Sequence, residues 1–138
     1  MWWTYALLSA VFAALTAILA KLGVRGVDSN VATAVRTGVV LVLAWVVVAV
    51  QGNLGLVTSI PRASLGFLVV SGLATGASWL FYFKALSAGP ASLVSAVDKS
   101  SLALMLVLAA LVLGESLNLR TMLGCALIIA GTAVIVWP

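Results

Sequence analysis

The sequence has little of what a soluble enzyme uses. It has no histidine and a single cysteine, Cys125, which excludes histidine-based catalysis, a disulfide within one chain and a Cys/His metal centre. Seven Lys or Arg and three Asp or Glu make up only 7% of the residues, against about a quarter in an average soluble domain. The net charge of +4 is small and scattered, which does not indicate a nucleic-acid partner. Because no nucleophile–base pair is visible either, we expect no enzymatic activity, no cofactor and no metal.

Long apolar stretches dominate the chain, and 64% of its residues are hydrophobic. A helix crosses the hydrocarbon core of a bilayer with roughly 20 mostly apolar residues. The first stretch has no Lys or Arg before it and is long for a signal peptide, so we expect it to be retained as a span. The sequence therefore predicts an all-α, multi-pass protein of the inner (plasma) membrane, a single domain over residues 1–138, with helices at about 3–22, 30–51, 63–87, 90–113 and 118–137.

The segments between the predicted helices are short and carry helix-ending residues. Gly89 followed by Pro90 is typical of one helix ending and the next beginning, and Asn118 is a good N-cap for the last helix. Short connections make consecutive helices run antiparallel, so we expect one compact five-helix bundle.

An odd number of spans places the two chain ends on opposite sides of the membrane. We call the side of the N-terminus side A and the other side B. Near the span ends, side A carries two Lys or Arg residues and side B three, namely Arg62 and Arg120 against Lys21, Arg25 and Lys84. The positive-inside rule therefore gives only a weak preference, with side B in the cytoplasm. A chain with so weak a preference can insert both ways round, which favours an antiparallel homodimer.

Two adjacent charges, Asp98 and Lys99, stand out within the fourth apolar stretch. A charge at the centre of a transmembrane helix costs about 2.5 to 3.5 kcal/mol on an insertion scale, so such residues face the bundle interior or a water-filled cavity. Neighbours on a helix point about 100° apart, so we expect no good pair between these two. Each then needs a partner from another helix, water, lipid or substrate.

Counting residues from side B places several polar and aromatic side chains in the same half of the membrane. At 1.5 Å per residue, Asp98 and Trp79 lie roughly 12 Å deep, Arg36 roughly 9 Å and Lys84 roughly 5 Å. We interpret them as a polar vestibule that opens from side B. Trp79, Tyr82 and Phe83 share a face of span three that suits stacking or cation–π contact with an organic substrate. The candidate substrate- or ion-binding residues are Arg36, Trp79, Tyr82, Lys84, Ser95, Asp98 and Lys99.

Structural roles are the alternative for the same residues. Asp98 and Arg36 can form an ion pair that only holds two helices together, while Lys99 extends to a lipid headgroup. Arg36 and Lys84 are also shallow enough for their side chains to extend to lipid headgroups. The aromatic side chains can pack against other helices or face lipid.

Spans three to five resemble an EamA-type domain of the drug/metabolite transporter superfamily. The resemblance rests on "FYFKALSAGPASLVSAV" and "LVLGESLNLRTMLGCALIIAGTAVIVW", which cover roughly residues 80 to 137, and on "ATAVRTGVV" in span two. Many members of the family have an apolar stretch with proline at the position of Asp98-Lys99. In this respect the sequence resembles instead the short, single-repeat bacterial and archaeal branch.

The resemblance implies a secondary transporter that works by alternating access. Larger relatives contain two five-helix repeats of inverted topology with the substrate between them, so a lone repeat implies a homodimer. Small multidrug exporters of the superfamily use a Glu in the first span, which this sequence lacks, and Asp98 is the acid available to replace it. The excess of cationic groups on side B slightly favours an anionic or zwitterionic small-molecule substrate. The alternative function is a membrane scaffold or accessory subunit that transports nothing.

Overall fold

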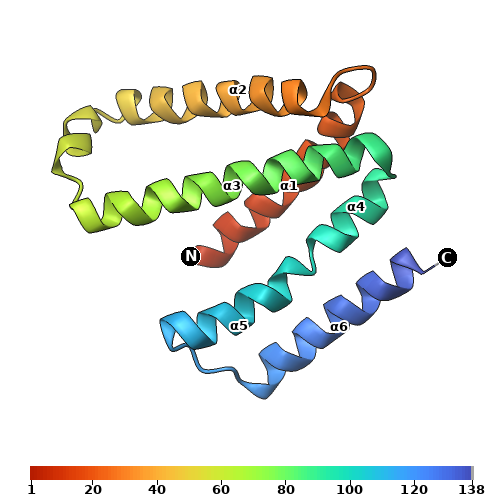
Figure 1. Ribbon diagram of the computed structural model, residues 1–138. Coiled ribbons are helices and arrows are strands. Elements are labelled where there is room, and N and C mark those ends of the chain that lie inside the picture. The colour runs from red at the N-terminus through yellow and green to blue at the C-terminus, as the bar shows by residue number, and fades with distance from the viewer. Residues whose placement is uncertain (138) are drawn as a thin grey trace. The chain divides into compact units, whose positions relative to one another are not determined.

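The structure, a computed structural model, describes residues 1–137 and contains helices and no strands over that range. Five segments are long and apolar enough to cross a membrane, with α4 and α5 counted together as the fourth. This confirms the predicted all-α membrane fold. The elements are α1 Trp2–Gly23, α2 Ser29–Val50, the short 3-10 helix η1 Leu54–Ser59, α3 Arg62–Ala88, α4 Ala91–Asp98, α5 Ser101–Leu113 and α6 Leu119–Val136 (Figure 1).

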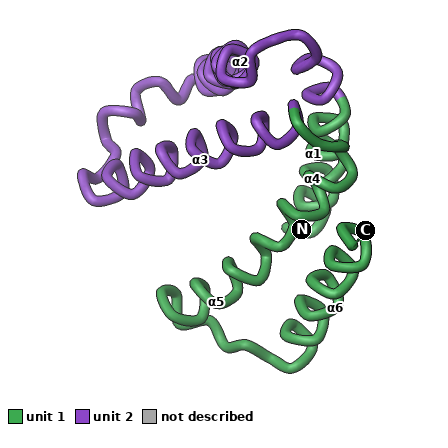
Figure 2. The backbone as a smooth tube through the Cα atoms, turned by 45° about the vertical axis from the view of Figure 1, so that its right-hand side comes forward, with its two compact units in different colours: residues 1–18, 88–138 green, residues 19–87 purple. Residues whose placement is uncertain are grey.

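The chain divides into two compact units, residues 19–87 and residues 1–18 with 88–138 (Figure 2). The first unit contains the last turns of α1, all of α2, η1 and nearly all of α3. The second contains the rest of α1 together with α4, α5 and α6. The prediction that the whole chain is one domain stays a prediction.

The unit of residues 19–87 has a small core where the end of α1, the start of α2 and the end of α3 meet. Ala20, Val24, Phe83 and Leu86 are buried there. The Lys21 ammonium in the last turn of α1 donates a hydrogen bond of 2.5 Å to the Leu86 carbonyl in the last turn of α3. The last carbonyls of a helix lack partners within the helix and carry partial negative charge, so an ammonium satisfies both needs. Lys21 thus joins α1 to α3.

Asp28 fixes the start of α2 by capping it. Its carboxylate accepts hydrogen bonds from the backbone N–H groups of Asn30 and Val31, at 2.9 and 3.1 Å. A capping carboxylate satisfies orphan donors and complements the positive end of the helix dipole. One of the three acidic residues of the chain therefore has a structural role.

In the other unit, α6 runs back beside α5 and α4 (Figures 1 and 2). Pro90 is the N-cap of α4, as its position in the sequence predicts. Gly114 ends α5 with a φ of 69°, a left-handed conformation that favours glycine, and the Glu115 N–H donates to the Ala109 carbonyl at 3.2 Å. The predicted cap at Asn118 is confirmed, since its side-chain oxygen accepts from the Thr121 N–H at 2.8 Å.

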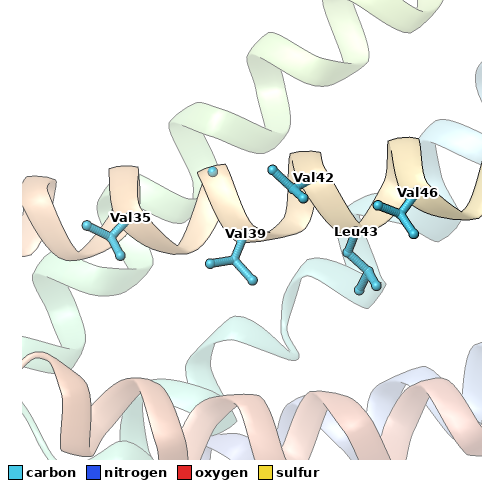
Figure 3. Close-up of a pocket in the computed structure, with 6 residues that line it drawn as sticks. Val35, Val39, Val42, Leu43 and Val46 are labelled. Atoms are coloured by element: carbon cyan, nitrogen blue, oxygen red, sulfur yellow. The ribbon is translucent and has the colours of Figure 1, made fainter.

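Most large apolar side chains lie on the outside of the described chain, as expected where lipid is the solvent. A shallow groove of about 540 Å³ along α2 illustrates this surface (Figure 3). Its lining comes from one helix and contains no polar side chain: Val35, Gly38, Val39, Val42, Leu43 and Val46. A groove of this kind suits acyl chains or another apolar helix, so we do not place a polar substrate there.

Candidate substrate-binding residues

The fourth span is interrupted in the middle, whereas the sequence predicts one helix over 90–113. α4 ends at Asp98, and α5 begins at Ser101. Between them Lys99 and Ser100 have φ, ψ values of −67°, −16° and −65°, −16°, which are typical of a 3-10 turn. The hydrogen bonds agree, because the N–H groups of Ser100 and Leu102 donate to carbonyls three residues back, at 3.0 and 3.1 Å.

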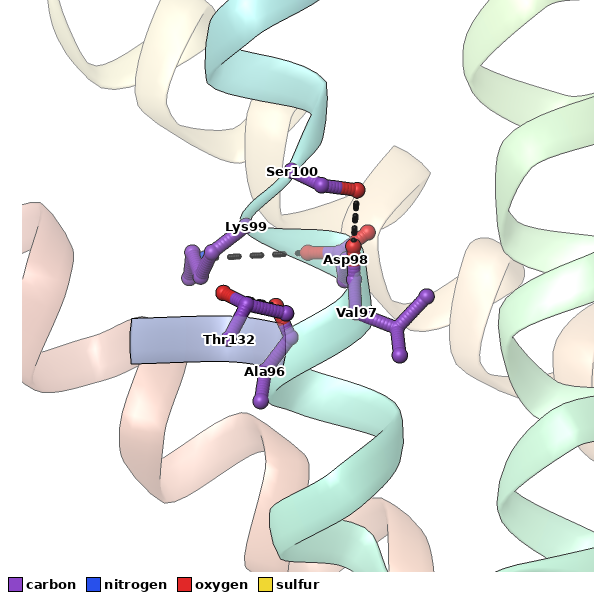
Figure 4. A network of polar contacts seen from close by, with 6 residues as sticks. All are labelled: Ala96, Val97, Asp98, Lys99, Ser100 and Thr132. Carbon is purple, nitrogen blue, oxygen red and sulfur yellow. Dashed lines mark hydrogen bonds and ion pairs between the residues drawn. The ribbon is translucent and has the colours of Figure 1, made fainter. Parts of the chain in front are cut away.

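Side-chain hydroxyls account for this interruption, since no proline or glycine lies within it. The Ser100 hydroxyl donates to the Val97 carbonyl at 2.6 Å. The Thr132 hydroxyl of α6 donates to the Ala96 carbonyl at 3.2 Å, and in a regular helix that carbonyl accepts from the Ser100 N–H instead (Figure 4). Serine and threonine hydroxyls compete with backbone donors in this way, and helices bend where they do.

The ends of Asp98 and Lys99 approach each other at the interruption. The Lys99 ammonium lies 3.6 Å from the Asp98 carboxylate, which is within ion-pair distance but longer than a hydrogen bond (Figure 4). The sequence predicted no good pair between these two residues, and the contact that they make is an exposed ion pair without a hydrogen bond. Their side chains remain 43% and 65% exposed, so the contact leaves the Asp98 carboxylate open to another partner.

We expect Thr132→Val to destabilise the protein by about 1 kcal/mol, because the Ala96 carbonyl loses a donor from α6. The measurement is the free energy of unfolding in detergent. Thr132→Ser keeps the hydroxyl and should retain most of the stability. Thr75→Val is the matched control, since the Thr75 hydroxyl bonds only within α3, to the Ser71 carbonyl. Equal losses for Thr132→Val and Thr75→Val would contradict a special role of the bond to Ala96.

Arg36 of α2 forms the second feature, a stack with aromatic side chains of α3. Its guanidinium carbon lies 4.2 Å from the centre of the Trp79 ring and 5.5 Å from that of Phe83. Both distances are within the range of cation–π attraction. Phe83 is buried, whereas Arg36 and Trp79 are half-buried. The sequence suggested a cation–π contact with a substrate, and in the structure the cation on these rings is Arg36 of the same chain.

The other candidate residues lie around these two features. Tyr82 is half-buried, with its ring edge-on to Phe83 at 6.5 Å between centroids, and Lys84 is exposed on α3. Ser95 is half-buried in the last turns of α4, and its carbonyl accepts from the Lys99 N–H at 3.3 Å. Arg36, Trp79, Tyr82 and Lys84 belong to the unit of residues 19–87, whereas Ser95, Asp98 and Lys99 belong to the other unit. The pairing of Arg36 with Asp98 stays a prediction.

One residue that the sequence did not single out takes part in these features, because Thr132 holds the interruption of span four. Nothing in the local sequence indicates this role, since Thr132 lies 36 residues after Ala96. Phe83, which the sequence places on the same face of span three as Trp79, supplies the second ring beside Arg36.

Comparisons with known proteins agree with the resemblance seen in the sequence. Residues 1–137 match the family described as the EamA-like transporter family. The chain is also similar to a Sinorhizobium sp protein described as "Uncharacterized transporter in cobO 3'region", with 47% identity over 134 residues. This alignment covers 97% of the chain and 95% of the relative, so the two are of nearly the same length. No solved structure matches the chain significantly.

Proposed function

Because the chain belongs to the EamA-like transporter family, a family of membrane transporters and not of enzymes, we propose that it is a secondary transporter that moves a small organic solute by alternating access. Its place is the plasma membrane, which it crosses with five spans. We further propose that the chain acts as one transmembrane domain and works as a homodimer.

The interrupted fourth span is the observation that carries this proposal. Irregular backbone at membrane depth is tolerated only where protein buries it or where it lines a water-filled cavity. Asp98 stands at this point, is the one acidic residue within the five spans, and has a side chain 43% exposed. A carboxylate in that position needs water, a cation or a proton, and transporters place substrate and coupling-ion sites at such discontinuous helices.

An anionic or zwitterionic solute suits the charges that remain once the structural ones are set aside. The Lys21 side chain bonds to a carbonyl at the end of α3, and the Asp28 side chain caps the start of α2. Both charges serve helix ends, so we leave them out of the charges that face a substrate. The candidate residues then carry the cations Arg36, Lys84 and Lys99 against the single acid Asp98.

Transport is tested by screening metabolite classes for thermal stabilisation of the purified protein and then measuring uptake of the stabilising solutes. Proteoliposomes with the protein should accumulate such a solute when a proton or sodium gradient is applied. Liposomes without protein provide the background. A protein that is stabilised by no solute and transports none would instead be a scaffold or accessory subunit, the alternative function.

The homodimer rests on the odd number of spans, the weak charge bias and the single-repeat length that the Sinorhizobium relative shares. An antiparallel pair restores the two inverted repeats of larger transporters. We expect C-terminal fusions to a reporter active only in the cytoplasm and to one active only outside it to give comparable signals. Signal from one side alone would exclude the antiparallel form and leave a parallel dimer.

A further inference from the structure

The Arg36 guanidinium lies against two aromatic rings of α3. The ring centres of Trp79 and Phe83 lie 4.2 and 5.5 Å from the guanidinium carbon. A guanidinium is planar and carries all its N–H donors in that plane, so an aromatic ring on its face uses none of them. These donors form a fork that matches two oxygens of a carboxylate or phosphate.

The unit that contains Arg36 offers no carboxylate for this fork. Asp28 is the one acidic residue in residues 19–87, and its carboxylate caps α2. The Thr33 and Thr37 hydroxyls on the same helix donate within α2, to the Ser29 carbonyl at 2.8 Å and the Thr33 carbonyl at 2.7 Å, and being neutral they supply no negative charge to Arg36. Arg36 is the eighth residue of α2, which places it roughly 10 Å along the helix. A half-buried cation at such a depth is stabilised by an opposite charge, so the site suits an oxyanion.

We propose that Arg36 is the receptor for the oxyanion, a carboxylate or phosphate, of the transported solute, and that Trp79 and Phe83 are positioning residues that hold its guanidinium plane. This inference rests on the proposed transport function and adds the residue that binds the anionic group of the solute. A lipid phosphate presents the same chemistry, and it reaches a shallow arginine from the headgroup layer. The transported solute is the source to which the proposal commits, because the aromatic rings hold the guanidinium within α2 and α3 and restrain its extension toward the headgroups.

Lysine is the informative replacement, because it keeps the charge and loses the fork and the stack. Arg36→Lys should weaken binding of carboxylates about tenfold or more, the loss expected for a charged hydrogen bond. Trp79→Leu should weaken it several-fold by freeing the guanidinium plane, whereas Trp79→Phe keeps an aromatic face and should restore most of the affinity. Arg62→Lys is the matched control, since Arg62 is exposed at the start of α3, and it should bind like wild type.

The experiment titrates purified protein in uncharged detergent with short mono- and dicarboxylates from acetate to adipate, and with inorganic phosphate. Each acid is compared with its amide at matched ionic strength, and the readout is the shift in melting temperature. A variant that keeps Trp79 and has phenylalanine in place of the other tryptophans, Trp2, Trp3, Trp45 and Trp137, localises the binding through its fluorescence. We expect acids but not amides to stabilise the protein and to change the Trp79 emission.

Several results would overturn the assignment. They are equal stabilisation by acids and amides, wild-type affinity in Arg36→Lys, and no stabilisation by any oxyanion of the panel. A response of Trp79 only to phosphatidylglycerol in nanodiscs would also overturn it, because the oxyanion would then belong to lipid. Uptake measurements separate this inference from the proposed function. Oxyanion binding at Arg36 without uptake of any solute contradicts transport, whereas uptake that Arg36→Lys leaves unchanged contradicts only the assignment of Arg36.

Discussion

Asp98→Asn should abolish gradient-driven uptake, to below about a tenth of the wild-type rate, while the protein still folds and binds its solute. The physical reason is the position of this carboxylate. It lies in the interrupted part of span four, is 43% exposed, and has only a 3.6 Å contact with Lys99. Intramembrane acids in such places bind and release protons or cations, and asparagine keeps the shape but carries neither charge nor titrating proton. The measurement is uptake into proteoliposomes across a range of external pH.

Glu115→Gln is the control for this replacement, because Glu115 lies between α5 and α6, outside the five spans. It should transport at the wild-type rate. Exchange of labelled for unlabelled solute needs no gradient, so Asp98→Asn should retain part of it. Normal uptake by Asp98→Asn with an unchanged pH dependence would rule out coupling through Asp98.

The second large effect concerns stability, and it tests the pair that the sequence predicts between Arg36 and Asp98. Removing one member of a buried ion pair typically costs about 3–5 kcal/mol, because the other charge is left without a partner. If this pair forms, Arg36→Ala and Asp98→Ala each destabilise the protein in detergent, and the double replacement loses less stability than the sum of the two. If the guanidinium instead serves an oxyanion of the solute, the two losses add. Part of the Arg36→Ala loss comes from the stack on Trp79, and the double-mutant cycle removes that part.

A second cycle with Arg62→Ala in place of Arg36→Ala provides the reference, and its two losses should add. If the losses of Arg36→Ala and Asp98→Ala also add, the two residues are not coupled. Asp98 is then satisfied by Lys99, water or the substrate. That outcome would leave the oxyanion assignment of Arg36 standing, because the fork of the guanidinium would have no competing carboxylate.

Local sequence signals predicted those parts of the fold that depend on neighbouring residues. Apolar runs of sufficient length specify spans, and Pro90 and Asn118 specify helix starts through properties of a few adjacent atoms. The interruption of span four could not be predicted in this way. Asp98 to Ser101 contains neither proline nor glycine, and the hydroxyl that competes for the Ala96 carbonyl belongs to Thr132 on another helix.

The sequence predicted which residues belong to the candidate site better than it predicted which of their side chains contact each other. Counting depth from the ends of α2 and α3 placed Arg36 and Trp79 at similar levels, and the structure brings them into contact. Depth alone does not specify which side of each helix faces the other, so the sequence left the partner of the aromatic rings open. Lys21 was counted in the sequence as an orientation signal and as one of the cations on side B, and in the structure its ammonium bonds to the Leu86 carbonyl.

The bond from Lys21 to Leu86 has a consequence for how the chain enters the membrane. The two residues are 65 positions apart, and ribosomes add about 5 to 20 residues per second, so the acceptor follows the donor by roughly 3 to 13 seconds. Before that carbonyl is synthesised we expect the ammonium to interact with water and anionic headgroups, where the positive-inside rule lets it influence the orientation of the first span. Once α3 is in place, the same charge is committed to a backbone carbonyl. We therefore expect Lys21 to act first in biogenesis, as a topological signal, and afterwards as part of the folded protein.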